Sequence, residues 1–503
     1  MKGLSCLIID DEADQASLNT KASRRIGIAV STINRLITDL RRFFHKNTYL
    51  QVTATPQSLF LQEPAHDYRP KFTVLSHPGK DYVGGEDFFG DASNLVREFP
   101  LVDITTIAPG AQPAARLDIP KSLLRALNTF VVAATYKRMK DADQNCAFLC
   151  HVSTRKTDHN HIVGLLRKYK TDLAQALKAK QAPTINRLRD AYDDLAKTHA
   201  GVRDSSFEKI IEDIEFLSPG ITVKLVNGDT DEDVAVKSPL NLFVGGNKLG
   251  RGVTIKNLLV SYYGRNPKKP QADTVLQHAR MYGYRRKDLG LLRLFLPRDL
   301  HQVFRAINQM ERGLRDLIAN NPEEGFRGVY LEGGLSPTRK SVLAPGAVGV
   351  YTAGNSYNPS QVVRDDNVTS ATAKIDKLVQ DIPDKGVQEM SIEQLQELVK
   401  LTRPDVSLSE HVWDTAAVAA SLGQLAKLKD HHKTGVVYVD RDRGLELARR
   451  ETQGILTGGE SSAVPPNKIA LFMLRTTATD GKNPSWWPQV RFPSGNYGFA
   501  FSV

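Results

Sequence analysis

Between residues 121 and 296, short apolar runs alternate with helical stretches. A helix-like stretch at 121–140 comes first, and further helical stretches separate most of the apolar runs. The runs lie at 147–152, 221–226, 240–244, 258–263 and 291–296. This alternation is typical of right-handed crossovers between the strands of a parallel sheet. The sequence therefore predicts an α/β domain over residues 119–329, with a helical insertion at 165–217.

Two further regions flank this domain. An apolar run at 4–9 that ends in acids, an amphipathic helix at 31–44 and a strand at 48–53 indicate part of another parallel sheet in residues 1–118. From residue 330 the composition shifts to Gly, Ser, Pro and Asn, and an α+β domain is expected over 330–503. Its helical patterns lie at 368–382, 391–402 and 409–428, and its strand-like pieces at 435–439, 469–474 and 497–503.

Charge and composition narrow the class of protein. Lysine and arginine (67) exceed aspartate and glutamate (56) by 11, which favours a polyanionic partner such as nucleic acid if the surplus gathers on one face. A merely basic, solvated surface is the alternative. The three cysteines form no C-x-x-C pair, which disfavours a disulfide framework and a structural zinc site. No apolar run approaches the roughly 18 residues of a membrane helix, so we expect a cytoplasmic protein with no membrane partner.

Two polar motifs stand where neighbouring predicted strands end. Asp10, Asp11, Glu12 and Asp14 follow the first strand, and Thr53-Ala54-Thr55-Pro56 follows the second. A carboxylate at such a position can bind magnesium through water, and an adjacent glutamate can orient a water for attack on a γ-phosphate. The threonine hydroxyls can hydrogen-bond to the acids. An ordinary helix cap and a plain turn are the alternatives.

Two more motifs lie in the 119–329 domain. After the strand at 240–244 come Gly250, Arg251, Gly252 and Thr254, where glycines let backbone amides approach a phosphate and the arginine can contact a nucleotide or nucleic-acid backbone. The segment 277–286 then carries several arginines. A guanidinium can stabilise charge on a phosphoryl group in transfer, and a solvated basic helix end is the alternative.

In this order the four motifs resemble motifs II, III, V and VI of superfamily 2 helicases. Residues 247–296 resemble most closely a helicase-like family whose distal part is called the Z-one domain, which is catalogued as an endonuclease. The matching pattern is Arg251-Gly252 with Thr254, then Asp273-Thr274, Gln277, Arg280, and Gly283-Tyr284-Arg285. The resemblance covers about residues 4–345.

Membership of this family implies two RecA-like lobes with ATP and Mg²⁺ between them. Asp11 would act on the magnesium ion, Glu12 would position the water, and Thr53 and Thr55 would couple the lobes. The nucleotide would also meet Gly250, Arg251, Gly252, Thr254 and Gln277. Arg280 and Arg285 would serve as arginine fingers, although they stand five residues apart and common helicases space this pair by three.

The phosphate-binding motif G-x-x-x-x-G-K-[ST] does not occur in the 503 residues: Asp81 follows Gly79-Lys80, and Asn483 follows Gly481-Lys482. In related chains this loop precedes the acids. We therefore expect an incomplete first RecA-like lobe with an exposed sheet edge and apolar surface. The chain is expected to be inactive alone and to act as an ATPase only when a P-loop segment completes it.

The resemblance implies a helicase-like ATPase that translocates or remodels double-stranded DNA in a restriction or phage-defence system, with a separate nuclease subunit as partner. One alternative is a non-enzymatic module that binds DNA or a nuclease. Another is a magnesium-dependent endonuclease. Asp158-His159-Asn160-His161 is a minor metal-site candidate, and Trp486-Trp487 either stack on nucleic acid or complete a small core.

Overall fold

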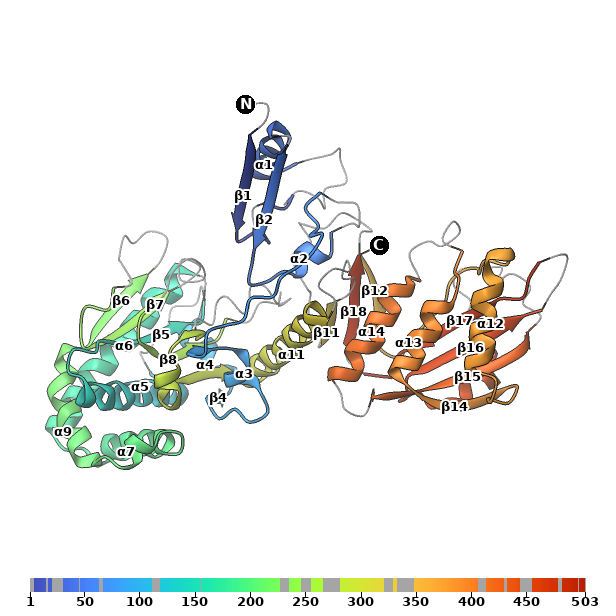
Figure 1. Cartoon of the computed structure of the whole chain (residues 1–503). Coiled ribbons are helices and arrows are strands. Elements are labelled where there is room, and N and C mark those ends of the chain that lie inside the picture. The colour runs from blue at the N-terminus through green and yellow to red at the C-terminus, as the bar shows by residue number, and fades with distance from the viewer. Residues whose placement is uncertain are drawn as a thin grey trace. The chain divides into compact units, whose positions relative to one another are not determined.

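The computed structural model of the chain divides into two compact units, Ser76–Asn308 and the combination of Met1–Leu75 with Gln309–Val503 (Figure 1). Among the residues described, no helix is both long and apolar enough to cross a membrane. The structure describes residues 4–14, 17–19, 30–44, 46–62, 67–110, 118–153, 155–226, 235–245, 255–265, 281–320, 329–332, 348–405, 413–428, 432–443, 455–477, 482–495 and 497–502.

A six-stranded parallel sheet forms the centre of the Ser76–Asn308 unit. Its strand order is β4-β10-β8-β5-β7-β6, and all neighbours pair in parallel. The strands are β4 (Val96–Phe99), β5 (Cys146–His151), β6 (Thr222–Val226), β7 (Leu240–Gly245), β8 (Leu258–Tyr263) and β10 (Arg293–Pro297). Every residue of β5, β7 and β8 is buried, as expected for a sheet covered on both faces. The predicted α/β fold is confirmed.

Helices cover this sheet. α5 (Lys121–Lys140) packs against β5, β8 and β10, and α6 (Lys156–Lys178) packs against β6 and β7. α7 (Ala182–Ala196) and α9 (Phe207–Leu217), joined by the short α8 (Ala200–Arg203), lie against α5. The predicted insertion at 165–217 is thus helical, and it consists of the distal part of α6 with α7, α8 and α9.

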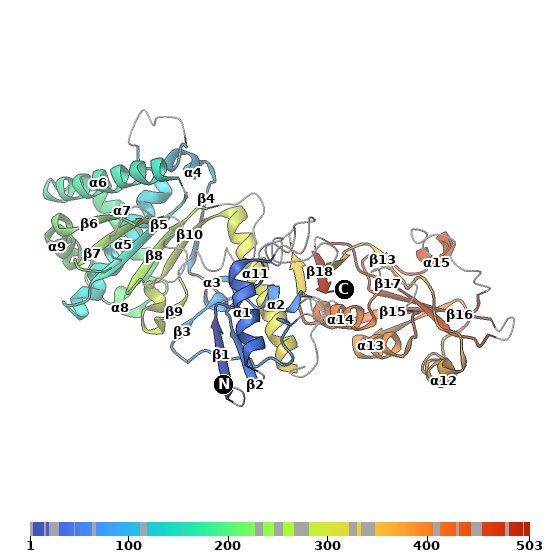
Figure 2. The same ribbon diagram turned by 90° about the horizontal axis from the view of Figure 1, so that it is seen from above.

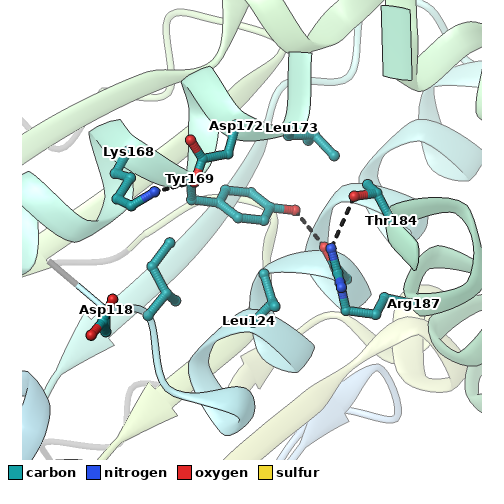
Figure 3. Close-up of a pocket in the computed structure, with 10 residues that line it drawn as sticks. Asp118, Leu124, Lys168, Tyr169, Asp172, Leu173, Thr184 and Arg187 are labelled. Carbon is teal, nitrogen blue, oxygen red and sulfur yellow. Dashed lines mark hydrogen bonds and ion pairs between the residues drawn. The ribbon is translucent and has the colours of Figure 1, made fainter. Parts of the chain in front are cut away.

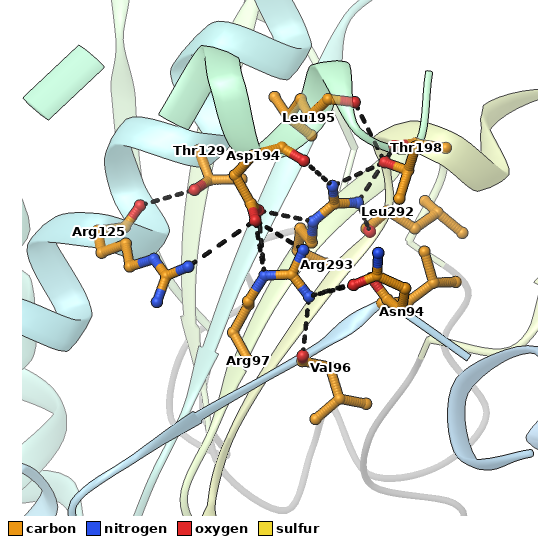
Figure 4. A network of polar contacts seen from close by, with 12 residues as sticks. Asn94, Val96, Arg97, Arg125, Thr129, Asp194, Leu195, Thr198, Leu292 and Arg293 are labelled. Carbon is orange, nitrogen blue, oxygen red and sulfur yellow. Dashed lines mark hydrogen bonds and ion pairs between the residues drawn. The ribbon is translucent and has the colours of Figure 1, made fainter. Parts of the chain in front are cut away.

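The carboxylate of Asp194 connects the helical insertion to the sheet through contacts with arginines (Figure 4). Asp194 on α7 accepts hydrogen bonds from Arg97 of β4 at 2.7 and 3.0 Å and from Arg293 of β10 at 3.0 Å. Arg125 of α5 lies 3.8 Å away. Burial acts to raise the pKa of Asp194, but the hydrogen bonds and positive charge of Arg97 and Arg293 outweigh it and lower that pKa.

The division of the chain differs from the boundary expected at residue 118. β4, which precedes that residue, pairs with β10 in the central sheet. The short β3 (Tyr82–Val83) likewise pairs with β9 (Gly283–Tyr284). These long-range pairings place residues 76–118 in the same unit as the later strands. Two short helices, α3 (Gly85–Phe89) and α4 (Val102–Ile107), also belong to this segment, and α11 (Arg298–Asn320) runs from this unit into the other.

The beginning of the chain forms a two-stranded parallel sheet. β1 (Ser5–Asp11) pairs with β2 (Lys46–Val52), and α1 (Thr32–Phe43) and α2 (Gln57–Phe60) complete the segment. One face of this sheet is apolar and exposed: Leu7 is 60% and Ile9 61% accessible, and Leu50 and Val52 are 45% accessible. This agrees with the expected apolar surface, since a parallel sheet is normally covered on both faces.

The remainder of the second unit is α+β, as predicted for residues 330–503. A mixed sheet has the order β13-β17-β16-β15-β14, and a smaller sheet has the order β11-β18-β12. Its strands are β11 (Val329–Glu332), β12 (Val348–Thr352), β13 (Ser356–Tyr357), β14 (Gly386–Ser391), β15 (Thr434–Arg443), β16 (Ala470–Thr476), β17 (Trp486–Arg491) and β18 (Tyr497–Ser502). Figure 2 shows α12 (Thr369–Leu378), α13 (Ile392–Leu401) and α14 (Thr415–Leu428) on one side of the mixed sheet and α15 (Gly458–Ser462) on the other.

Trp486 and Trp487 settle one alternative left by the sequence. Both are buried in β17, with Trp486 in the core under α12–α14 and Trp487 in the core of the opposite face. Their indole N–H groups donate to Asp376 and to the carbonyl of Pro359 at 2.9 and 2.8 Å. These side chains complete the core, so the nucleic-acid stacking interpretation is wrong for this conformation.

Candidate functional site

The carboxyl ends of β1 and β2 bring the acids and the threonines together. Asp14 is buried, and its two carboxylate oxygens accept hydrogen bonds from the hydroxyls of Thr53 and Thr55 at 2.7 and 2.9 Å. The backbone N–H of Thr55 donates to the Thr53 hydroxyl at 2.9 Å. The predicted hydrogen bonding between threonines and acids is therefore confirmed, with Asp14 as the acceptor. We call Asp14, Thr53 and Thr55 the acid–threonine clamp.

Asp10 also forms hydrogen bonds that stabilise the fold. Its carboxylate accepts hydrogen bonds from the hydroxyl of Ser17 at 2.6 Å and from the phenol of Tyr49 on β2. Burial, and then the hydrogen bond to Asp10, raise the pKa of Tyr49, so the phenol stays protonated and acts as the donor. Sequence patterns do not show these roles of Asp10 and Asp14, because they depend on how the chain turns after β1.

Asp11 and Glu12 are exposed, in contrast to Asp14. One oxygen of Asp11 accepts the Glu12 N–H at 3.1 Å. Glu12 has a φ of 61°, a left-handed conformation that costs a non-glycine residue about 1 kcal/mol or more and that often marks functional sites. Among the described residues, no group of three or more His, Cys, Asp or Glu side chains gathers to hold a metal ion. The exposed Asp11 carboxylate suits Mg²⁺, which is commonly held by one or two carboxylates, waters and substrate phosphates.

In the other unit, the central sheet has a topological switch point between β5 and β8. The chain continues from β5 to β6 on one side of the sheet and from β8 to β10 on the other. Crevices at the carboxyl ends of such strands are the usual ligand sites of open α/β sheets. The residues at this edge include the buried His151, which makes an edge contact with the ring of Tyr263.

The turn from β5 to α6 at this edge is held by side chains. Asp158 accepts hydrogen bonds from the Ser153 hydroxyl at 2.6 Å and from the Gly110 N–H at 2.9 Å. His159 Nε2 lies 2.8 Å from the carbonyl of Ser153. Asp158 and His159 are both buried. Asp158 and His159 therefore stabilise the turn. This argues against the metal site that the sequence suggested for them.

Arg285 is bound within its own unit. Its guanidinium donates to the carbonyls of Leu258 at 2.9 Å and Tyr282 at 3.4 Å, and burial lowers its pKa. Its role as an arginine finger stays a prediction. Gly250, Arg251, Gly252, Thr254, Gln277 and Arg280 lie outside the described residues, which resume at Ile255 and Met281 after gaps.

Several solved structures are similar to parts of this chain. The C-terminal domain of the CglI restriction endonuclease H subunit matches 28% of this chain and 99% of its own, with 14% identity and a TM-score of 0.24. Dbp5 of S. cerevisiae, bound to RNA and ADP BeF3, matches 64% of each chain at 11% identity and a TM-score of 0.26. The ATP-dependent Type ISP restriction-modification enzyme LlaBIII, bound to DNA, matches 61% of this chain and 21% of its own, at 15% identity and a TM-score of 0.24.

A comparison with curated proteins gives no match. A comparison with protein families gives a match that covers every strand of the central sheet except β4. Residues 122–329 of this chain match the Z1 domain.

Proposed function

We propose that this chain is the helicase-like part of a DNA-acting ATPase in a restriction or phage-defence system. The observation that carries the proposal is the acid–threonine clamp, which joins the carboxyl ends of two parallel strands and leaves Asp11 and Glu12 exposed beside it. The Z1 match over residues 122–329 supports it. The protein would work in the cytoplasm, where its DNA substrate lies.

ATP with Mg²⁺ would supply the free energy for opening and closing the two RecA-like lobes. Asp11 would hold the magnesium ion through water, and Glu12 would orient the attacking water. The clamp would transmit the state of this site, because Asp14 fixes Thr53 and Thr55 to the acid segment. Arg280 and Arg285 would stabilise charge on the transferred phosphoryl group, and residues 250–254 with Gln277 would contact the nucleotide. Arg285 would first have to release the carbonyls of Leu258 and Tyr282.

The 503 residues hold no G-x-x-x-x-G-K-[ST] motif, so the amides and lysine that cradle the phosphates would come from a further polypeptide segment. DNA, a nuclease subunit and this P-loop segment are the proposed partners. The basic surplus of 11 charges suits the DNA partner.

The test is DNA-stimulated ATP hydrolysis by the chain purified together with its native partners. Glu12→Gln keeps the size of the side chain and removes the carboxylate, and it should lower turnover at least tenfold, which corresponds to ~1.4 kcal/mol in the barrier. Glu397→Gln makes the same change at an exposed position of α13 and should leave turnover unchanged. Wild-type turnover in the Glu12→Gln complex would contradict the proposal.

A non-enzymatic DNA- or nuclease-binding module is the second candidate. It is favoured by the absence of the phosphate-binding motif from these residues and by the bound state of Arg285. DNA affinity that falls steeply with salt and does not respond to ATP would support it, because phosphate contacts release counterions. Plasmid nicking with magnesium and no nucleotide would instead support the endonuclease alternative.

A further inference from the structure

A cavity of about 200 Å³ opens between α5, α6 and the start of α7 (Figure 3). This volume holds about seven water-sized groups, which suits a small organic molecule. Its apolar wall includes Leu124 of α5 and Leu173 of α6. Its polar wall is formed by Asn128, Arg187 and three further charged side chains. All of these residues belong to the Ser76–Asn308 unit, whereas the acid–threonine clamp belongs to the other unit.

The orientation of Asn128 is fixed by Tyr169. Both residues are 2% exposed, and the Tyr169 hydroxyl lies 2.9 Å from Asn128 Oδ1. Burial raises the pKa of Tyr169, so the phenol is protonated and donates its hydrogen to that oxygen. The amide Nδ2 of Asn128 is then left as a donor on the cavity wall, and it finds no acceptor among the residues that the structure describes. This amide nitrogen is not among the buried atoms without a partner, so it keeps some contact with solvent and can donate to water or to a ligand.

The cavity also carries one uncompensated cation. Lys168 and Asp172 neutralise each other across 2.6 Å. Arg187 donates to the hydroxyl of Thr184 at 2.9 Å and forms no ion pair with the described residues. Asp118, the remaining acid of the lining, lies on the far side of Leu124 from Arg187 in Figure 3. A negative ligand group is therefore favoured at the Arg187 end of the cavity and disfavoured at the other.

We propose that this cavity binds a small carboxylate with an apolar body. Arg187 presents the planar fork that pairs with carboxylates, and Asn128 Nδ2 supplies a second donor. The apolar body of the ligand packs against Leu124 and Leu173. Because α5, α6 and α7 all contribute to the wall, ligand binding ties the insertion to the helix that lies on the central sheet.

The test uses para-fluorobenzoate as the probe and fluorine NMR of the whole chain as the readout. Saturable binding with a Kd of about 1 mM or tighter is expected for so small a ligand. Para-fluorobenzamide has the same shape without the charge, and it should bind at least tenfold more weakly. This comparison uses the unaltered protein, so it does not depend on the folding of a variant, and it is independent of any ATPase activity.

Two variants then locate the site. Arg187→Gln should weaken benzoate binding at least tenfold, since Arg187 lies in the lining and is exposed enough to be replaced without loss of the fold. Arg167→Gln removes the same charge from an exposed position of α6 outside the lining and should leave binding unchanged. Equal binding of the acid and the amide, no saturable binding of the acid, or full binding to the Arg187→Gln protein would each overturn the proposal.

Discussion

Replacing Asp194 by asparagine should destabilise the Ser76–Asn308 unit by about 3 kcal/mol. The side chains of Arg293 and Arg97 are 0% and 11% exposed, and removing one partner of a buried ion pair typically costs about 3–5 kcal/mol because the remaining charge is left uncompensated. Arg293 also donates to the carbonyl of Gly290 and the hydroxyl of Thr198 at 3.1 and 2.7 Å. These neutral acceptors place the expected loss at the lower end.

The effect can be assigned to one unit because of where the tryptophans lie. The three tryptophans of the chain, Trp413, Trp486 and Trp487, all belong to the other unit. Tryptophan fluorescence during urea unfolding should therefore be the same in Asp194→Asn and wild type. Amide hydrogen exchange in α7, β4 and β10 should accelerate by roughly 100-fold, which corresponds to about 3 kcal/mol.

Asp193→Asn is the matched control, since it removes the same charge from the exposed neighbouring residue. We expect it to change stability by less than about 0.5 kcal/mol. The pKa of Asp194 is lowered in the fold, so its contribution is full above its ordinary pKa of ~3.9 and is lost as the pH falls through the lower native value. The stabilities of Asp194→Asn and Asp193→Asn should therefore become equal at acidic pH. Equal exchange rates in both variants at pH 7 would refute a stabilising role for the network.

Three further changes test the other unit. Burial raises the pKa of Glu311 to about 7, although the charge of Arg315 acts to lower it. Above that pH the ionised carboxylate destabilises the fold, whereas below it the carboxyl group is neutral. Glu311→Gln should therefore slow amide exchange in α11 at pH 8 but not at pH 4. Thr55→Val removes a hydroxyl that donates to the buried carboxylate of Asp14 and should cost about 1–3 kcal/mol in urea unfolding. A loss below about 0.5 kcal/mol would contradict the clamp. Glu12→Gly relieves the left-handed backbone at φ 61°, so thermal unfolding should show equal or higher stability while ATP hydrolysis by the partnered complex is lost.

The central sheet could be predicted from the sequence because buried parallel strands are apolar on both faces. β5, β7 and β8 are short runs of mostly apolar residues, and their signal does not depend on distant contacts. β4 has only four residues, two of them the charged Arg97 and Glu98, and its place depends on pairing with a strand about 200 residues later. β17 contains Pro488, a residue that normally argues against a strand.

Part of the candidate site could also be predicted from the sequence. Parallel strands end at the same edge of a sheet, so motifs that follow two paired strands meet wherever the chain turns. That argument brings Thr53 and Thr55 to the acids, but it does not select Asp14 among them. The backbone carbonyls that hold Arg285 belong to the first residue of β8 and to the residue before β9, and no residue pattern identifies such acceptors.

The alternatives of a helix cap and a plain turn can now be weighed against the contacts. α1 begins at Thr32 after Ser31, so the acids do not cap it, and Thr55 is only 3% exposed with its hydroxyl bound to Asp14. Two of the four acids serve the fold, because the oxygens of Asp10 accept hydrogen bonds from Ser17 and Tyr49 and those of Asp14 accept from the two threonines. Asp11 and Glu12 remain exposed at the same strand end, with the backbone of Glu12 strained. Stability alone does not explain a glutamate at that position, where glycine would be less strained, and this is the physical reason to seek the chemistry of the chain there.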